Sequence, residues 1–575
     1  MTRRPTARWV AATVALALTA VACGGDDDAG SDDTAEATAD TGEAAGDDTG
    51  EATGDDTASG DDSGDSDGAV SGTLRIAEQQ APDPFDPATL SDNRSIELAQ
   101  NVYNGLTAID PDTSEVVPAL AESWEVSDDG LEYTFTLRDD VTFQSGKALT
   151  ADDIVYSLNR AVDPDVRSGY AFFLAVIDGY GAVSDGSAEA LAGVEALDDR
   201  TVVIRLGQPA GYLPSLLTLW PYWAVDSETI AEFGDDWVNP PNTNGTGSYA
   251  LVEQTADTEY VFEANTDFWG DTKPTIEEIV VTIVPESSTA LARYEAGEFD
   301  VIRNLTSATY RQVLADPELT EQLGTASLLR TTWYNMRSDV PPFDDIRVRE
   351  AFNLAIDRDA IVEIALGGLG SPAATFLPPG LPGSIADERE AITTDAEAAQ
   401  ALLAEAGYAE GEGFPDLTLY YDARDDFQSV AELVQAQLAA NLGIDIELAP
   451  TPSTAYNEML NDAERRPVFS MYTFGLDYPD PQEMHEYLVQ SQPNGFANYG
   501  NFSNAEVDEM IAAANASTDP AERYALHSEI DRIFLDEWAI IPLYHPVATW
   551  LAKPEVDGFE VNSLYMTRWE GVSLS

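Results

Sequence analysis

The sequence predicts an α/β fold, and three stretches carry this prediction. Residues 131–138 alternate apolar and polar side chains strictly, which is typical of a half-buried strand. Residues 150–161 begin with a capping box and continue with apolar side chains at helical spacing. Residues 417–448 contain two apolar strands on either side of a helical segment, which is the spacing of a parallel crossover unit.

The first half of the chain supplies most of the clearly patterned elements. A second alternating strand is expected at 201–206, and an apolar strand at 276–284 leads through Pro285 into a helix near 287–298. The helix after the first strand begins with a Thr-x-x-Asp capping box. The residues that define this box and the apolar faces are Leu131, Tyr133, Phe135, Leu137, Thr150, Asp153, Ile154, Leu158 and Ala161.

The second half predicts a strand, a helix and a strand in succession. These elements are marked by Leu417, Leu419 and Tyr421, by residues 427–441 with Gly443 as the helix stop, and by residues 444–448. A further strand at 468–474 runs directly into the loop 475–481. Open sheets bind ligands at the carboxyl ends of their strands, so we expect this loop to form a wall of a ligand site.

The N-terminus predicts an export signal. Three arginines precede the apolar stretch 9–22, which is too short to span a bilayer comfortably. Cys23, the only cysteine, follows small residues at the end of this stretch, and the arrangement resembles a bacterial lipobox. We expect residues 1–22 to be a lipoprotein signal peptide and Cys23 to receive a diacylglycerol. Ordinary signal cleavage beside a stray cysteine is the alternative.

Residues 23–69 predict an acidic disordered tether. From residue 24 to 69 the segment has 17 acidic residues and no lysine, arginine or aromatic residue. It cannot bury enough apolar surface to offset chain entropy, and charge repulsion keeps it extended. An acidic tail that binds a metal or a partner is the alternative.

The remaining body is long enough for two or three domains. The whole chain has a formal net charge of −76, which excludes nucleic acid as a partner. No later stretch is long and apolar enough to be a transmembrane helix.

Four stretches of the body resemble one family, the extracytoplasmic solute-binding proteins of peptide and nickel ABC importers, of the oligopeptide- and dipeptide-binding type. They are Ala-Glu-Ser-Trp and Leu-Thr-Ala-Asp-Asp within 118–158, Gly-Thr-Gly-Ser-Tyr at 245–249 with Asn-Thr-Asp-Phe-Trp-Gly at 265–270, Pro-Phe-Asp-Asp-Ile-Arg-Val-Arg at 342–349 with Ala-Ile-Asp-Arg at 355–358, and Leu-Asp-Tyr-Pro-Asp-Pro at 476–481. The resemblance extends from about residue 72 to the C-terminus.

The resemblance implies a bilobal periplasmic-binding-protein-like fold, of type II and the large peptide-binding class, with a hinge and an extra inserted domain. The implied parts are lobe I at 70–108, 230–330 and 545–575, the inserted domain at 109–229, and lobe II at 331–544. Two crossings, near 329–333 and 544–546, would form the hinge about which the lobes close on a ligand.

The resemblance also implies the function. The chain would be the substrate-binding component of an ABC importer, anchored to the outer face of the cell membrane, and would deliver a peptide to a permease and its ATPase. We expect a monomer without cofactor, metal or enzymatic activity. A receptor of the same fold for an oligosaccharide, opine or metal chelate is the first alternative. An enzyme, or an adhesion or signalling module, is the second.

Asp477 is the expected partner of a peptide ammonium, because the resemblance places the amino-binding Asp at this position and a dehydrated ammonium needs a carboxylate. Capping of the turn that follows is the alternative role. Phe474 stands where peptide-binding relatives usually have Trp, and Gly475 would offer backbone contacts. Met471 stands where oligopeptide-binding relatives have the Arg that meets the peptide carboxylate.

Other candidates for the cleft are Trp333, Tyr334 and Asn335 on the first crossing, and Tyr472 on the strand before Asp477. Packing in the core is an equal alternative for all four. Residues 245–247 and 342–345 are interpreted as structural turns and caps.

Enzyme signals are weak. The three histidines, His485, His527 and His545, are far apart in sequence, and neither a Gly-x-Ser-x-Gly elbow nor a His-Glu-x-x-His helix occurs. His485 follows the Asp477 loop, and if it faced the cleft it would offer one ligand to a metal chelate. One histidine is a poor metal site, and a satisfied core histidine is the commoner role.

Overall fold

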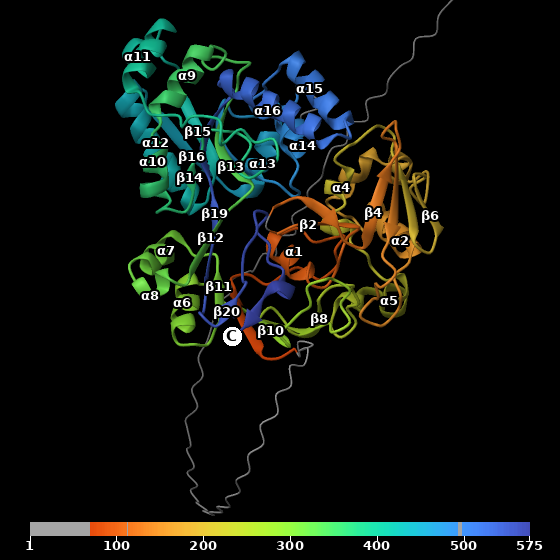
Figure 1. The fold of residues 1–575 in the computed structure, drawn as a ribbon. Helices are drawn as coiled ribbons and strands as arrows, with labels where there is room; N and C mark the ends of the chain where they lie inside the picture. Colours follow the sequence, from red (N-terminus) through yellow and green to blue (C-terminus); the bar gives the residue numbers. More distant parts are fainter. Residues whose placement is uncertain (1–69, 112, 493–496) are drawn as a thin grey trace, which may run out of the picture. The chain divides into compact units, whose positions relative to one another are not determined.

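The computed structural model describes residues 70–111, 113–492 and 497–575, and the regions named below are shown in Figure 1. The predicted signal peptide, Cys23 and the acidic tether lie outside the described residues, and they stay predictions. Within the described ranges, no helix combines the length and the apolar character needed to cross a bilayer.

A seven-stranded mixed sheet collects segments from both ends of the chain. Its central strand β1 is parallel to β10 and β11, and the outer strands pair antiparallel. In spatial order the strands are β12 (Leu323–Ser327), β19 (Val547–Ala552), β11 (Val301–Arg303), β1 (Thr73–Glu78), β10 (Glu278–Ile283), β9 (Glu259–Ala264) and β8 (Tyr249–Thr255). The helices of this part are α1 (Asn93–Ala99), α5 (Ser227–Phe233), α6 (Ser287–Glu295), α7 (Ser307–Leu314) and α8 (Pro317–Thr320). The predicted strand at 276–284 and the helix after it are confirmed as β10 and α6.

A four-stranded antiparallel sheet lies in the segment between β1 and β8. Its order is β4 (Ala121–Val126), β5 (Glu132–Leu137), β7 (Thr201–Arg205) and β6 (Val194–Asp198). The same segment contains the β2 (Thr107–Ile109) and β3 (Val116–Pro118) pair and helices α2 (Ala151–Val162), α3 (Tyr180–Ser184) and α4 (Leu213–Leu216). The two alternating strands are confirmed as β5 and β7. The capping box is confirmed too, because the Thr150 N–H donates to Asp153 Oδ2 at 2.9 Å.

A six-stranded sheet is the third large sheet of the chain. Its order is β14 (Ser371–Pro372), β18 (Ile540–His545), β13 (Arg330–Met336), β17 (Phe469–Gly475), β15 (Leu417–Asp422) and β16 (Ile446–Thr451). Its helices are α9 (Ile346–Ala355), α10 (Arg358–Ala360), α11 (Ala396–Glu405), α12 (Asp425–Leu442), α13 (Ser453–Asn461), α14 (Pro481–Met484), α15 (Ala505–Ala516) and α16 (Pro520–Asp536). The parallel crossover is confirmed: β15 and β16 pair in parallel, α12 connects them, and Gly443 ends α12 at a φ of 69°.

Short turns complete the fold. A β20 (Val556–Asp557) and β21 (Ser573–Leu574) pair lies near the C-terminus. Single 3-10 or π turns occupy Ala171–Val176, Trp220–Tyr222, Gly234–Val238, Ile361–Ala365, Ala409–Gly411, His485–Val489 and Trp569–Gly571.

The chain passes between the seven-stranded and six-stranded sheets at two places. The first lies between β12 and β13, and the second lies at Pro546, between β18 and β19. These two crossings are adjacent, because the Leu328 N–H donates to the Pro546 carbonyl at 3.2 Å. The boundaries of the two lobes and of the inserted domain stay predictions.

Strand β13 is buried on both faces, and this decides where its side chains lie. One face joins a core cluster that contains Tyr334, Tyr421 and Leu438. The other face joins a second cluster that contains Trp333 and Phe376. Neighbouring residues of β13 therefore enter different cores.

Candidate ligand-binding site

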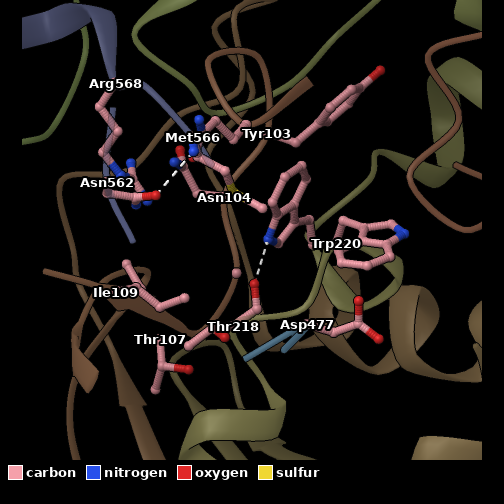
Figure 2. A pocket seen from close by; sticks show the side chains of 14 residues that line it. Tyr103, Asn104, Thr107, Ile109, Thr218, Trp220, Asp477, Asn562, Met566 and Arg568 are labelled. Carbon is pink, nitrogen blue, oxygen red and sulfur yellow. Dashed lines mark hydrogen bonds between the residues drawn. The ribbon is translucent and has the colours of Figure 1, made fainter. Parts of the chain in front are cut away.

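Asp477 lies at the wall of a small pocket (Figure 2). Strand β17 ends at Gly475, so the loop leaves the sheet at the carboxyl end of the strand, where ligand sites are expected. The side chain of Asp477 is half-buried. The loop predicted as a site wall therefore does border a pocket.

The other walls come from three distant segments of the chain. Residues 100–109, 218–223 and 562–568 supply them, and Asp477 is the one lining residue from the part built on the six-stranded sheet. Figure 2 shows Asp477 and Trp220 on one side, with Asn562, Met566 and Arg568 across from them. The pocket thus combines aromatic surface with a carboxylate and a few polar groups, as small-ligand sites usually do.

Glu483 supports Asp477 from the first turn of α14. The backbone N–H of Asp477 donates to Glu483 Oε2 at 3.0 Å. Glu483 is 1% exposed, and its Oε1 atom makes no hydrogen bond to any described residue. Burial raises the pKa of Asp477 to about 6, and burial beside Asp477 raises the pKa of Glu483 well above its usual range.

Asp480, not Asp477, caps the helix that follows the loop. The Gln482 N–H donates to Asp480 Oδ1 at 3.0 Å, which is the geometry of an N-cap. Arg523 binds both carboxylate oxygens of Asp480, at 2.7 and 2.8 Å, and both side chains are buried. The capping role proposed as the alternative for Asp477 is thus carried by Asp480, and Asp477 borders the pocket beside Glu483.

Gly475, two residues before Asp477, lines a second pocket, which is more open than the first. Phe474 and Tyr472 are half-buried on one face of β17 and join the core cluster of Trp333. Tyr472 lies edge-on to Trp333, with ring centres 5.4 Å apart. Neither aromatic side chain lines either of the two pockets.

The three candidates on β13 lie away from Asp477. Trp333 and Asn335 line a small separate cavity, where the Trp333 indole N–H donates to Asn335 Oδ1 at 2.8 Å. Tyr334 is fully buried in the opposite core. These positions favour the packing alternative for all three residues.

His485 is a buried core histidine. Its side chain is 0% exposed, and its Nδ1 lies 2.9 Å from Nδ1 of His527. Burial, followed by the neighbouring His485, lowers the pKa of His527 well below its usual range. His485 does not face the cleft, because the α14 turn directs it into the interior against α16. Among the described residues, no group of three or more metal-ligating side chains is placed to hold a metal ion.

The two turn motifs have structural roles, as interpreted. Asp345 caps α9, since its carboxylate accepts from the Arg347 N–H at 3.0 Å. A Cβ at Gly245 would lie 1.8 Å from the Val102 carbonyl, so only glycine fits this close approach.

Several pocket residues were missed by the sequence reasoning. Trp220, Trp223, Tyr103 and Thr218 carry no motif, and they reach the pocket only because two segments distant from Asp477 in the sequence pack beside it. The sequence offered one signal for Glu483, because it is an acidic residue six positions after Asp477.

The comparisons with known proteins agree on one family. The model of the bacterial extracellular solute-binding proteins, family 5 Middle, matches residues 115–496. The probable deoxycholate-binding periplasmic protein YgiS of Escherichia coli is 30% identical over 501 residues, which cover 85% of this chain and 91% of the relative. The periplasmic oligopeptide-binding protein OppA of Escherichia coli is 29% identical over 484 residues, which cover 83% and 87%.

Solved structures agree with this result. The unliganded open form of the Escherichia coli murein tripeptide-binding protein MppA has a TM-score of 0.77 and 28% identity, and the match covers 88% of this chain and 99% of that one. Haemophilus influenzae OppA in complex with RPPGFSPFR has a TM-score of 0.66 and 26% identity, with coverage of 88% and 99%.

Two sheets joined by two adjacent crossings, with a pocket lined from both sides, define a two-lobed solute receptor of the type II periplasmic-binding-protein fold. The chain belongs to family 5 of the bacterial extracellular solute-binding proteins. It is therefore an extracytoplasmic, substrate-binding component of an ABC importer, and it is a transport receptor rather than an enzyme.

Proposed function

We propose that this receptor captures a peptide and binds its ammonium group at Asp477. The observation that carries the proposal is the half-buried Asp477 carboxylate at the pocket wall, with its backbone fixed by Glu483 and its capping role taken by Asp480. An ammonium that leaves water in a closed cleft needs such a carboxylate. Relatives named as oligopeptide- and dipeptide-binding proteins support a peptide as the cargo.

Replacing Asp477 tests the proposal directly. Asp477→Asn leaves the ammonium without its charged partner, and losing one side of a buried ion pair costs about 3–5 kcal/mol. The dissociation constant for a peptide should rise roughly a hundredfold to several thousandfold, measured by titration calorimetry. Asp267→Asn, an exposed acid on another loop, is the matched control and should bind like the wild type.

Acetylating the peptide amino group completes the cycle. The acetyl group should weaken wild-type binding by a similar factor and weaken Asp477→Asn binding little further, because both changes delete one interaction. Additive losses would mean that the ammonium binds elsewhere.

We also propose that the receptor is a monomer anchored through a lipid on Cys23. Cys23→Ser should release the body into the medium without changing its melting temperature. A variant that stays in the membrane fraction would contradict the anchor, and the scattering mass of the released body tests the monomer.

A non-peptide solute is the second candidate. Two relatives are named as deoxycholate-binding and heme-binding proteins, and the aromatic walls around Trp220 and Trp223 would suit a flat apolar solute. Native mass spectrometry of the purified protein distinguishes the two, since a receptor that retains a cargo without an amino group would move this candidate to first place.

A further inference from the structure

The second pocket is positively charged, although the chain is strongly acidic. Its charged lining residues are Arg94, Arg330, Arg424 and Asp426. The whole chain has 28 Lys and Arg residues against 104 Asp and Glu residues. This pocket has three arginines against one aspartate, so its charge is opposite in sign to that of the whole chain. Such a cavity attracts an anionic occupant.

Arg330 is the cation in this pocket that lacks a partner. It is the first residue of β13, its side chain is half-buried, and its guanidinium lies against Gly475, where a Cβ would be 2.6 Å from Nη2. Within the described ranges, this guanidinium donates no hydrogen bond and forms no ion pair. Burial, and then the charge of Arg424, lowers its pKa. A partly buried charge without a counter-ion is costly, and a bound anion would offset that cost.

The other arginines show what a satisfied guanidinium looks like here. Arg424 forms an ion pair with Asp426 at 2.9 Å, and its charge lies 3.9 Å from the centre of the Phe427 ring. Arg358, fully buried in the same part of the fold, donates to the Pro542 carbonyl at 2.7 Å and to Asn353 Oδ1 at 2.9 Å. Arg330 has no comparable acceptor among the described residues.

Asp477 is the acidic residue whose charge acts on Arg330, but it does not bind the guanidinium. The charge of Asp477 acts on Arg330, yet no hydrogen bond or ion pair joins the two described side chains. Asp477 lines the first pocket and Gly475 the second. A ligand that lies along residues 475–477 would therefore reach both pockets.

We propose that Arg330, with Arg424 beside it, forms an anion subsite that binds a carboxylate of the cargo. The planar fork of a guanidinium matches a carboxylate through two parallel hydrogen bonds. The inference rests on the proposed function in taking this carboxylate as the C-terminus of a peptide whose amino group lies at Asp477. It supplies the partner that Met471 leaves open.

Calorimetry with tetra-alanine and its C-terminal amide tests the subsite. Amidation should weaken binding to the wild type by about tenfold to a hundredfold, the range for a lost charge-assisted hydrogen bond. Arg330→Gln should weaken binding of the free acid by a similar factor and leave binding of the amide nearly unchanged. Equal losses for acid and amide in this variant, or a wild type indifferent to amidation, would overturn the proposal.

Arg389→Gln is the matched control, because Arg389 pairs with Asp536 and lines neither pocket. It should keep the wild-type preference for the free acid. The melting temperatures of both variants check that Arg330→Gln leaves the fold intact.

A second measurement decides the subsite independently of the peptide. Phenylglyoxal, read by mass spectrometry of proteolytic fragments, should modify Arg330 of the full chain faster than the enclosed Arg358. Succinate should slow the modification of Arg330 and leave that of Arg389 unchanged. If tetra-alanine fails to bind but succinate protects Arg330, the peptide proposal is wrong and the anion subsite stands. If succinate gives no protection, the subsite is wrong whatever the peptide does.

Discussion

The Asp477 carboxyl group competes for a proton and for the ligand at the same place. An ammonium binds the ionised carboxylate, whereas burial raises the pKa of Asp477 to about 6. Glu483 retains a proton to higher pH, because burial and the charge of Asp477 both raise its pKa. The pair therefore ionises first at Asp477, which is the member that lines the pocket.

Peptide affinity should consequently rise as the pH rises through about 6, and level off above it. Titration calorimetry between pH 5 and 8 at constant ionic strength measures this. Asp477→Asn should bind weakly and lose most of the dependence. A wild-type affinity that is flat across this window would contradict the assigned ionisation.

The stability of the ligand-free receptor should respond in the opposite direction. The folded-state pKa of Asp477 lies above the unfolded value of about 3.9. Between these values the folded state binds more protons than the unfolded state, so this group's contribution to the unfolding free energy falls as the pH rises from about 4 through about 6. The unfolding free energy of the wild type minus that of Asp477→Asn should therefore fall as the pH rises across this window, measured by urea unfolding at several pH values.

Single residues were predictable from sequence only where a motif marked them. Asp477 stands in a recognisable loop and does line a pocket. Trp333 and Asn335 stand on a recognisable strand, but alternation cannot tell which face of a strand meets ligand when both faces are buried. The position of Trp220 in the pocket could not be predicted, because it depends on how a segment distant in sequence packs against the Asp477 loop.

At the scale of elements, α14 connects the core to the site. Its N-cap Asp480 is held by Arg523 from α16, and its first turn carries Glu483, which holds the backbone of Asp477. Three residues, Asp480, Glu483 and Arg523, thus fix the loop that carries the Asp477 carboxylate. A change in this support should lower both stability and binding, whereas a change at Asp477 should lower binding and alter stability only through the lost ionisation of that carboxyl group.

Asp480→Asn tests this support. The change leaves the buried Arg523 guanidinium without a full counter-charge, and breaking such a pair costs about 3–5 kcal/mol of unfolding free energy. Urea unfolding followed by tryptophan fluorescence measures the loss. Thr150→Ala, which removes the half-exposed capping box of α2, should cost only about 1 kcal/mol. A cost for Asp480→Asn no larger than this reference would mean that the pair does not anchor the loop.

Elements with a local signal were predicted well. The alternation at β5, the capping box at α2 and the Gly443 stop after α12 depend on residues close in sequence, and all three are confirmed. The assembly of sheets was not predictable in this way. In the seven-stranded sheet, β19 lies between β11 and β12, although it follows both by more than 200 residues in the chain. No local sequence pattern encodes that pairing.

At the scale of the whole molecule, the two crossings determine how the receptor can move. Only the segments between β12 and β13 and between β18 and β19 join the two large sheets directly, within the part of the chain that the structure describes. They lie side by side through the hydrogen bond from Leu328 to Pro546. Two adjacent connections permit rotation of one part about the other at small cost, because few backbone angles need to change.

Ligand binding should therefore compact the receptor. A peptide held by Asp477 from one part of the fold and by residues 100–109 and 562–568 from the other gains contacts only when the two parts approach. Small-angle X-ray scattering should show a smaller radius of gyration with saturating peptide. At a free peptide concentration of about 100 times the dissociation constant, the unfolding free energy should rise by about 2.7 kcal/mol through mass action. Asp477→Asn at the same peptide concentration is the control and should keep the ligand-free radius. An unchanged wild-type radius, together with the full gain in stability, would show that the peptide binds to a rigid cleft and that the crossings do not act as a hinge.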